Sequence, residues 1–122
     1  MKINPNKQFE LLWASLGGQP LLKEYRFCGT RRFRFDYYSD SGVAIEIEGG
    51  IWTKGRHTRG AGYIKDMEKY NLAAQRRILV FRIPAHKITT EWLRPIISTI
   101  NHGGSMMHYN LIKAIKERTK KC

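Results

Sequence analysis

Two stretches of alternating apolar and polar residues, separated by a short turn, place the strongest constraint on how this chain folds. Residues 31–38 read Arg-Arg-Phe-Arg-Phe-Asp-Tyr-Tyr, and residues 43–48 read Val-Ala-Ile-Glu-Ile-Glu. The Ser-Asp-Ser-Gly segment between them has residue types that favour a turn. Because successive side chains of a strand point to opposite faces of a sheet, the pattern predicts a β-hairpin whose strands each have one apolar face.

The alternation also predicts which side chains share a face of each strand. In the first strand, the aromatic face carries Phe33, Phe35 and Tyr37, and the polar face carries Arg32, Arg34 and Asp36. In the second strand, the apolar face carries Val43, Ile45 and Ile47, and the other face carries Ala44, Glu46 and Glu48. Both apolar faces are expected to pack against a core.

Acidic residues are concentrated in this hairpin: four of the ten in the chain lie between positions 36 and 48. If Tyr38 pairs with Ala44 across the turn, Asp36 lies opposite Glu46. Asp36, Glu46 and Glu48 then project from one face, with Arg34 opposite Glu48. Like charges opposed on a sheet repel one another, and a divalent cation would reverse that repulsion. The pattern is therefore consistent with a Mg²⁺ or Mn²⁺ site suited to phosphodiester hydrolysis, or with surface ion pairs to Arg32 and Arg34.

The rest of the chain predicts an α/β fold. Apolar residues recur at helical spacing, and shorter apolar runs predict further strands. The expected helices cover residues 5–17, 62–75, 91–100 and 106–119, and the expected strands cover 22–28 and 77–83. We place Tyr63, Met67, Tyr70 and Ala74 on the buried stripe of the second helix, and Leu111, Ile112 and Ile115 on that of the last. This order predicts one domain over residues 1–122, with a mixed central sheet flanked by helices.

The net charge of +12 indicates a polyanionic partner, chiefly nucleic acid. No apolar run reaches the length of a membrane-spanning helix, and the N-terminus lacks the apolar stretch of a signal peptide, so we expect a cytoplasmic protein that does not enter a membrane. Cys28 and Cys122 are the only cysteines, and we expect both to be free thiols.

Basic residues after the hairpin are candidates for phosphate contacts, although a solvated basic surface is an equally good interpretation of each one. They are concentrated in a glycine-flanked loop and on the helix after it, and they include Lys54, Arg56, Arg59, Lys65 and Lys69. Arg34 on the hairpin is a further candidate. His57 in the loop is a candidate proton shuttle or phosphate contact, or else an exposed loop histidine. His86, His102 and His108 have no metal-ligand spacing and receive no role.

These motifs together resemble the PD-(D/E)XK nuclease superfamily, and within it the small nucleases related to very-short-patch repair endonucleases. The resemblance rests on Arg34-Phe35-Asp36, on the run from Ala44 to Gly50, and on the helix and strand that follow, and it covers roughly residues 8 to 84. It implies an αβββαβ restriction-endonuclease-like core over about residues 5–84, followed by a helical extension over about 89–120.

The resemblance also implies roles for particular residues. Asp36 and Glu46 would hold the metal ion, with the main-chain carbonyl of Ile47 as a further ligand, and Glu10 on the first helix would lie nearby. The sequence departs from the family at Glu48, where a lysine is usual. Glu48 cannot stabilise developing negative charge; it would instead bind metal or orient water, and Lys54 or Lys65 would supply the missing positive charge.

The resulting hypothesis is a Mg²⁺-dependent DNA endonuclease, bacterial or from a bacterial virus, whose product carries a 5′-phosphate. Two-strand cleavage would need two active sites, and therefore a homodimer. The alternative hypotheses are a nucleic-acid-binding protein with a degenerate nuclease site and a structural RNA-binding protein. The sequence leaves open which DNA structure or sequence would be the substrate.

Overall fold

The structure, a computed structural model, describes residues 3–49 and 60–120 and has an α/β architecture with a four-stranded mixed sheet. This confirms the fold class expected from the sequence. The elements in chain order are α1 (Pro5–Ser15), β1 (Leu22–Arg26), β2 (Arg34–Ser39), β3 (Val43–Glu48), α2 (Ala61–Gln75), β4 (Leu79–Pro84), α3 (Thr90–Asn101) and α4 (Met106–Lys120).

The strands lie in the order β1-β2-β3-β4, and the direction of pairing changes once across the sheet. β1 pairs antiparallel with β2, and β2 pairs antiparallel with β3. β3 pairs parallel with β4, with Glu46 level with Arg82. Parallel neighbours need a long crossover connection, and α2 lies in the connection between these two strands. The sheet therefore brings residues from β2, β3, β4 and α2 close together.

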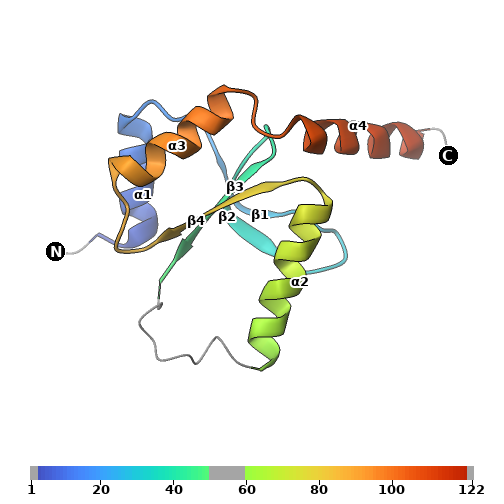
Figure 1. Ribbon diagram of the computed structural model, residues 1–122, viewed down its shortest axis with the longest axis horizontal. Coiled ribbons are helices and arrows are strands. Elements are labelled where there is room, and N and C mark those ends of the chain that lie inside the picture. Colours follow the sequence, from blue (N-terminus) through green and yellow to red (C-terminus); the bar gives the residue numbers. More distant parts are fainter. Residues whose placement is uncertain (1–2, 50–59, 121–122) are drawn as a thin grey trace.

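Helices cover both faces of the sheet (Figure 1). α1 and α3 pack on one face, and their core includes Phe9, Trp13, Tyr37, Ile45 and Leu93. α2 packs on the other face, and its core includes Phe27, Phe35, Tyr38, Ala44 and Ala73. The expected alternation holds in β3, where Val43 and Ile45 belong to the first core and Ala44 to the second. The two cores hold the sheet between the helices.

The expected alternation is wrong in β2, because the strand changes face at Asp36. Phe35 packs in the core beneath α2, whereas Tyr37 packs in the core beneath α1 and α3. The paired strand β1 has an irregularity beside this break: Glu24, between Lys23 and Tyr25, has a left-handed φ of 49°. Residues with that backbone conformation break the two-residue alternation of a strand. The register stays constant on both sides of the break, with Lys23 level with Tyr37 and Tyr25 level with Phe35, so both strands change face together.

Two of the expected helix stripes are also corrected. In α2, Tyr63, Met67 and Ala74 are exposed, and the side chains that approach the sheet are Tyr70 and Ala73. In α4, Leu111 and Ile112 are half-buried as expected, but Ile115 is exposed. Both helices extend beyond the sheet (Figure 1), so part of each apolar stripe has no sheet to cover it.

The start of α4 is fixed by a buried histidine to which the sequence assigned no role. His108 Nδ1 lies 2.6 Å from the Arg76 carbonyl oxygen, and Nε2 lies 2.8 Å from the Tyr38 hydroxyl. Because a carbonyl can only accept, Nδ1 donates to it, and Nε2 forms the hydrogen bond with the Tyr38 hydroxyl. Gly42 turns beneath this ring with a φ of 84°, and a Cβ there would approach His108 to 3.0 Å.

The described helices include none that is both long and apolar enough to cross a lipid bilayer.

Candidate active site

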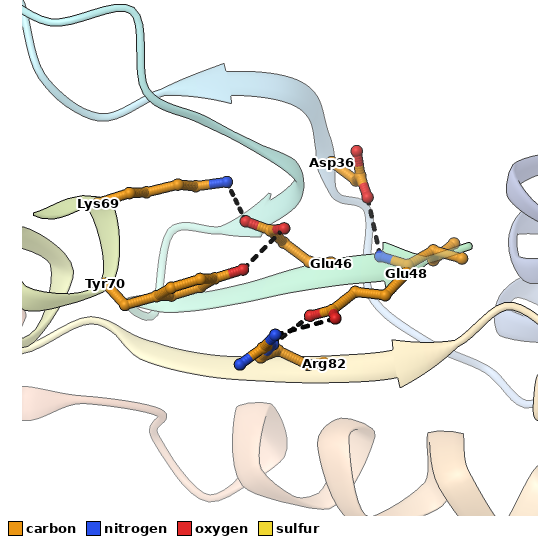
Figure 2. Close-up of polar contacts among 7 residues, drawn as sticks. Asp36, Glu46, Glu48, Lys69, Tyr70 and Arg82 are labelled. Carbon is orange, nitrogen blue, oxygen red and sulfur yellow. Dashed lines mark hydrogen bonds and ion pairs between the residues drawn. The ribbon is translucent and has the colours of Figure 1, made fainter. Parts of the chain in front are cut away.

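The main-chain pairing of β2 with β3 ends before Asp36, and the side chain of Asp36 contacts β3 in its place. Tyr38 is level with Ala44 as expected, and the main-chain register runs from Ser39 and Val43 to Tyr37 and Ile45. At the next position, Asp36 Oδ2 accepts a hydrogen bond of 2.8 Å from the Ile47 main-chain nitrogen (Figure 2). The change of face in β2 thus directs the Asp36 carboxylate toward the main chain of β3.

Glu46 points toward α2 and is held there by two side chains. Its Oε1 atom forms an ion pair with Lys69 Nζ, and its Oε2 atom accepts a hydrogen bond of 3.0 Å from the Tyr70 hydroxyl (Figure 2). The Glu46 and Lys69 side chains are each 14% exposed. Lys69 Nζ also lies 4.8 Å from the centre of the Phe35 ring, on the same face of the sheet. The carboxylate is therefore fixed in direction and largely shielded from water.

Glu48 is neutralised by the neighbouring strand. Arg82 on β4 donates to both of its carboxylate oxygens, with Nη2 2.9 Å from Oε1. This contact raises the pKa of the Arg82 guanidinium, which also lies 4.8 Å from the centre of the Tyr70 ring. The expected partner, Arg34, instead lies 3.5 Å from Glu24 in an exposed ion pair. The expectation that Arg34 faces Glu48 was therefore wrong.

Tyr70 acts as a hydrogen-bond donor because its hydroxyl resists ionisation. Burial raises the pKa of this phenol, and the negative charge of Glu46 raises it further. The hydroxyl therefore stays protonated at neutral pH and donates a hydrogen bond to Glu46. Tyr70 and Lys69, which are adjacent in sequence, together orient one carboxylate from α2.

Glu10 lies with a different set of partners, on the α1 side of the sheet. It accepts a hydrogen bond of 2.7 Å from the Tyr37 hydroxyl and forms a 2.9 Å ion pair with Lys23. The hydrogen bond from Tyr37 is the main cause that lowers the pKa of Glu10, followed by the hydrogen bond from Lys23. Burial and the Glu10 carboxylate raise the pKa of Tyr37. The charge of Asp36 also raises the pKa of Tyr37, the tyrosine that donates to Glu10.

Asp36, Glu46 and Glu48 each have a separate partner, and they do not form a ready metal cluster. Within residues 3–49 and 60–116, whose side chains the structure describes, no three His, Cys, Asp or Glu side chains converge as metal ligands. The donors nevertheless suit Mg²⁺ or Mn²⁺, which prefer oxygen ligands. Asp36 Oδ1 accepts no hydrogen bond from the described residues. Each Glu46 oxygen has one partner there, whereas a carboxylate has about four lone-pair sites. As far as the described residues go, both candidate ligands therefore have acceptor positions without a partner.

Several candidates from the sequence cannot be placed in this site. Four of them lie at positions 50–59, outside the described residues: Lys54, Arg56, His57 and Arg59. Lys65 is on the exposed half of α2. Lys69, Tyr70 and Arg82 were not predicted from the sequence as the partners of the glutamates. A signal was available for Lys69 and Tyr70, because they precede the small residue Ala73 at helical spacing.

Comparisons with known proteins give no relative for this chain. No family model matches it, and neither a search of curated proteins nor a search of solved structures gives a match.

Proposed function

We propose that this chain is a metal-dependent endonuclease that hydrolyses phosphodiester bonds in DNA. The observation that carries the proposal is the placing of two acids, Asp36 and Glu46, where the pairing of β2 and β3 stops, in a chain of net charge +12. A basic protein attracts the DNA backbone without help from acids. Acids held in fixed directions are what a metal-dependent nuclease needs in addition.

The shielding of Glu46 supports a role beyond stability. Removing an ion pair from water costs much of what the two charges gain from each other, so such a pair adds little to the stability of a fold. Glu46 and Lys69 are 14% exposed and are held by contacts from two elements.

The residues of the site divide the chemistry among them. Asp36 and Glu46 would hold the metal ion, with the Ile47 carbonyl as a third oxygen donor suggested by the family resemblance. A bound divalent cation would polarise a phosphoryl oxygen and lower the pKa of an attacking water. The Ile47 N–H orients Asp36, and the Tyr70 hydroxyl orients Glu46. Glu48, which lies two residues after Glu46 on β3 and is paired with Arg82, would adjust the position of the water or the metal ion.

Lys69 is the best source of the positive charge that the family usually takes from the position of Glu48. Its ammonium group contacts Glu46, whereas Lys65 is on the exposed half of the helix. An ammonium group beside the reacting phosphate would stabilise the negative charge that develops there. We therefore assign this role to Lys69 in place of Lys65 or Lys54.

The test is nicking of supercoiled plasmid with Mg²⁺, with Mn²⁺ and with EDTA. Asp36→Asn, Glu46→Gln and Lys69→Met are each expected to slow cutting by about 100-fold or more, by analogy with the loss of one charge-stabilising group in other enzymes. DNA binding by the Asp36 and Glu46 variants should persist. Glu91→Gln on α3 removes an acid on the opposite face of the sheet and serves as the matched control. Substantial cutting by the purified Asp36 or Glu46 variant would remove that residue from the active site.

A second candidate function is DNA binding without cleavage. The observation that favours it is Glu48, which stands in place of a lysine and is neutralised by Arg82. A panel of linear, nicked, mismatched and four-way DNA separates the two functions. Binding of any of these without metal-dependent cutting would identify the non-catalytic protein. As an enzyme, the protein would act on DNA in the cytoplasm of a bacterium or a phage-infected cell, and as a homodimer if it cuts both strands.

A further inference from the structure

A pocket of about 460 Å³ lies beside the candidate site, between the β1–β2 loop and α2. Four cationic side chains and one carboxylate line it: Arg31, Arg32, Lys65, Lys69 and Asp66. Lys69 also contacts Glu46, so one side chain belongs to both the pocket and the candidate site. An anion held in this pocket would therefore lie next to the carboxylates of the site.

Two of the four cationic side chains that line the pocket are ion-paired with glutamates, and the other two are not ion-paired with any described residue. Arg31 is tied to Glu68 at 2.5 Å, and Lys69 is tied to Glu46. Arg32 and Lys65 are exposed and form no ion pair with any described residue. They approach the pocket from opposite sides, one from the loop and the other from the helix. Their positive charges are therefore available to an external anion.

The aromatic residue in the lining of the pocket, Phe33, already contacts other side chains, which disfavours stacking of a nucleic-acid base on it. Phe33 also lines the pocket, and the Arg31 guanidinium lies over its ring, 4.3 Å from the centroid. Phe27 stacks with the same ring at a centroid distance of 6.4 Å. A base that stacked on the face contacted by Arg31 would have to displace the guanidinium. The pocket lining has four cations and a single aromatic ring, already in contact with Arg31, and so suits a phosphate better than a base.

We infer that this pocket binds the sugar–phosphate backbone of the DNA strand that passes the Glu46 site, independently of base sequence. The inference rests on the proposed function, because it takes Glu46 as part of the nuclease centre. Arg32 and Lys65 contact phosphates of the strand, while Arg31 and Lys69 stay paired with Glu68 and Glu46. Contacts of this kind position a nucleic acid without reading its sequence.

The test measures binding separately from cutting. Wild type, Arg32→Ala/Lys65→Ala and a control, Lys87→Ala/Arg94→Ala, are titrated in EDTA against short fluorescent DNA duplexes of two unrelated sequences over a range of salt. The control removes two exposed positive charges from the α3 side of the sheet. Each phosphate contact contributes about 0.9 to the slope of log affinity against log salt concentration. Lowering the salt from about 1 M to about 0.1 M therefore increases the affinity about eightfold for each contact. The pocket variant should lose about 60-fold in affinity and about 1.8 in slope, equally for both sequences.

A duplex with uncharged methylphosphonate linkages should bind weakly and should no longer distinguish wild type from the pocket variant. Equal affinity and slope for the pocket variant and the control would overturn the inference, as would a loss confined to one sequence. Failure of wild type to bind DNA would overturn both this inference and the proposed function. If wild type binds, the pocket variant loses binding as stated, and no metal supports cutting, the pocket stands and the nuclease proposal fails.

Discussion

The ion pair between Glu46 and Lys69 gives the sharpest test of how the candidate site is built. We expect Lys69→Met to destabilise the metal-free protein, because it leaves a carboxylate that is 14% exposed without its cation. We also expect Glu46→Gln to be destabilising. An account based only on repulsion between Asp36 and Glu46 would predict the opposite sign, since it would make loss of the Glu46 charge favourable.

The magnitude follows from burial and from the partners that remain. Two unit charges about 4 Å apart attract by about 4 kcal/mol at an effective dielectric constant of about 20, and removing one partner of a fully buried pair costs about 3–5 kcal/mol. Tyr70 continues to donate to Glu46, so we expect about 2–3 kcal/mol for Lys69→Met. Glu46→Gln should cost about 1–2 kcal/mol, because the amide still accepts from Tyr70 and Lys69 keeps its contact with Phe35. The double variant should cost about 2 kcal/mol. This is about 2 kcal/mol less than the sum of the costs of the two single variants, and that difference is the coupling energy between the two side chains.

The assay is urea unfolding at neutral pH in EDTA, with the free energy of unfolding obtained by linear extrapolation. Arg31→Met and Glu68→Gln form a matched control cycle, because that ion pair is 45% exposed on both sides and should couple by less than about 1 kcal/mol. Additivity of the Glu46 and Lys69 variants within about 0.5 kcal/mol would show that the two charges do not interact appreciably. Lys69 would then lose its assignment as the counter-ion of the site.

Two further predictions concern the α1 side of the molecule and one glycine of α2. Gly18→Ala should destabilise the fold by about 1–3 kcal/mol, because its Cβ would lie 2.3 Å from the buried indole of Trp13. Gly62→Ala, in open space on α2, should instead stabilise by about 0.5–1 kcal/mol; equal urea midpoints would refute this contrast. The folded-state pKa of Glu10 is lowered, chiefly by Tyr37, so its carboxylate stabilises the fold above the ordinary carboxyl pKa and loses that effect as the pH falls through the lowered value. Glu10→Gln should therefore be less stable than wild type near neutral pH and approach it in acid, whereas a pH-independent difference in urea unfolding would refute the role of the charge.

The fold class and most element boundaries could be predicted because they depend on local pattern. Alternation in residues 43–48 and the turn before them predict β3 and the pairing of Tyr38 with Ala44. The same rule fails in β2, where Phe35 and Tyr37 lie in different cores beside a left-handed residue of the paired strand. No periodicity within residues 31–38 contains that information.

The candidate site was only partly accessible from the sequence, for a related reason. The importance of Asp36 and Glu46 was inferred from their spacing in the hairpin, and the structure places both at the end of its pairing. The partners of the glutamates come from α2 and β4, and their selection depends on how these elements dock. Lys65 and Lys69 lie on the same side of the helix, and the docked helix shows that Lys65 is exposed and that Lys69 contacts Glu46.

The sequence separation of these contacts implies an order of assembly during folding. Asp36 and Ile47 are 11 residues apart, Glu46 and Lys69 are 23 apart, and Glu48 and Arg82 are 34 apart. Contacts between nearby residues close smaller loops, and parallel strand pairing has to wait for its crossover. We therefore expect the β2–β3 hairpin to fix Asp36 early, while both glutamates still face water. Their cations would arrive with α2 and β4 in the last step, so that the site acquires its final charge balance only when the sheet is complete.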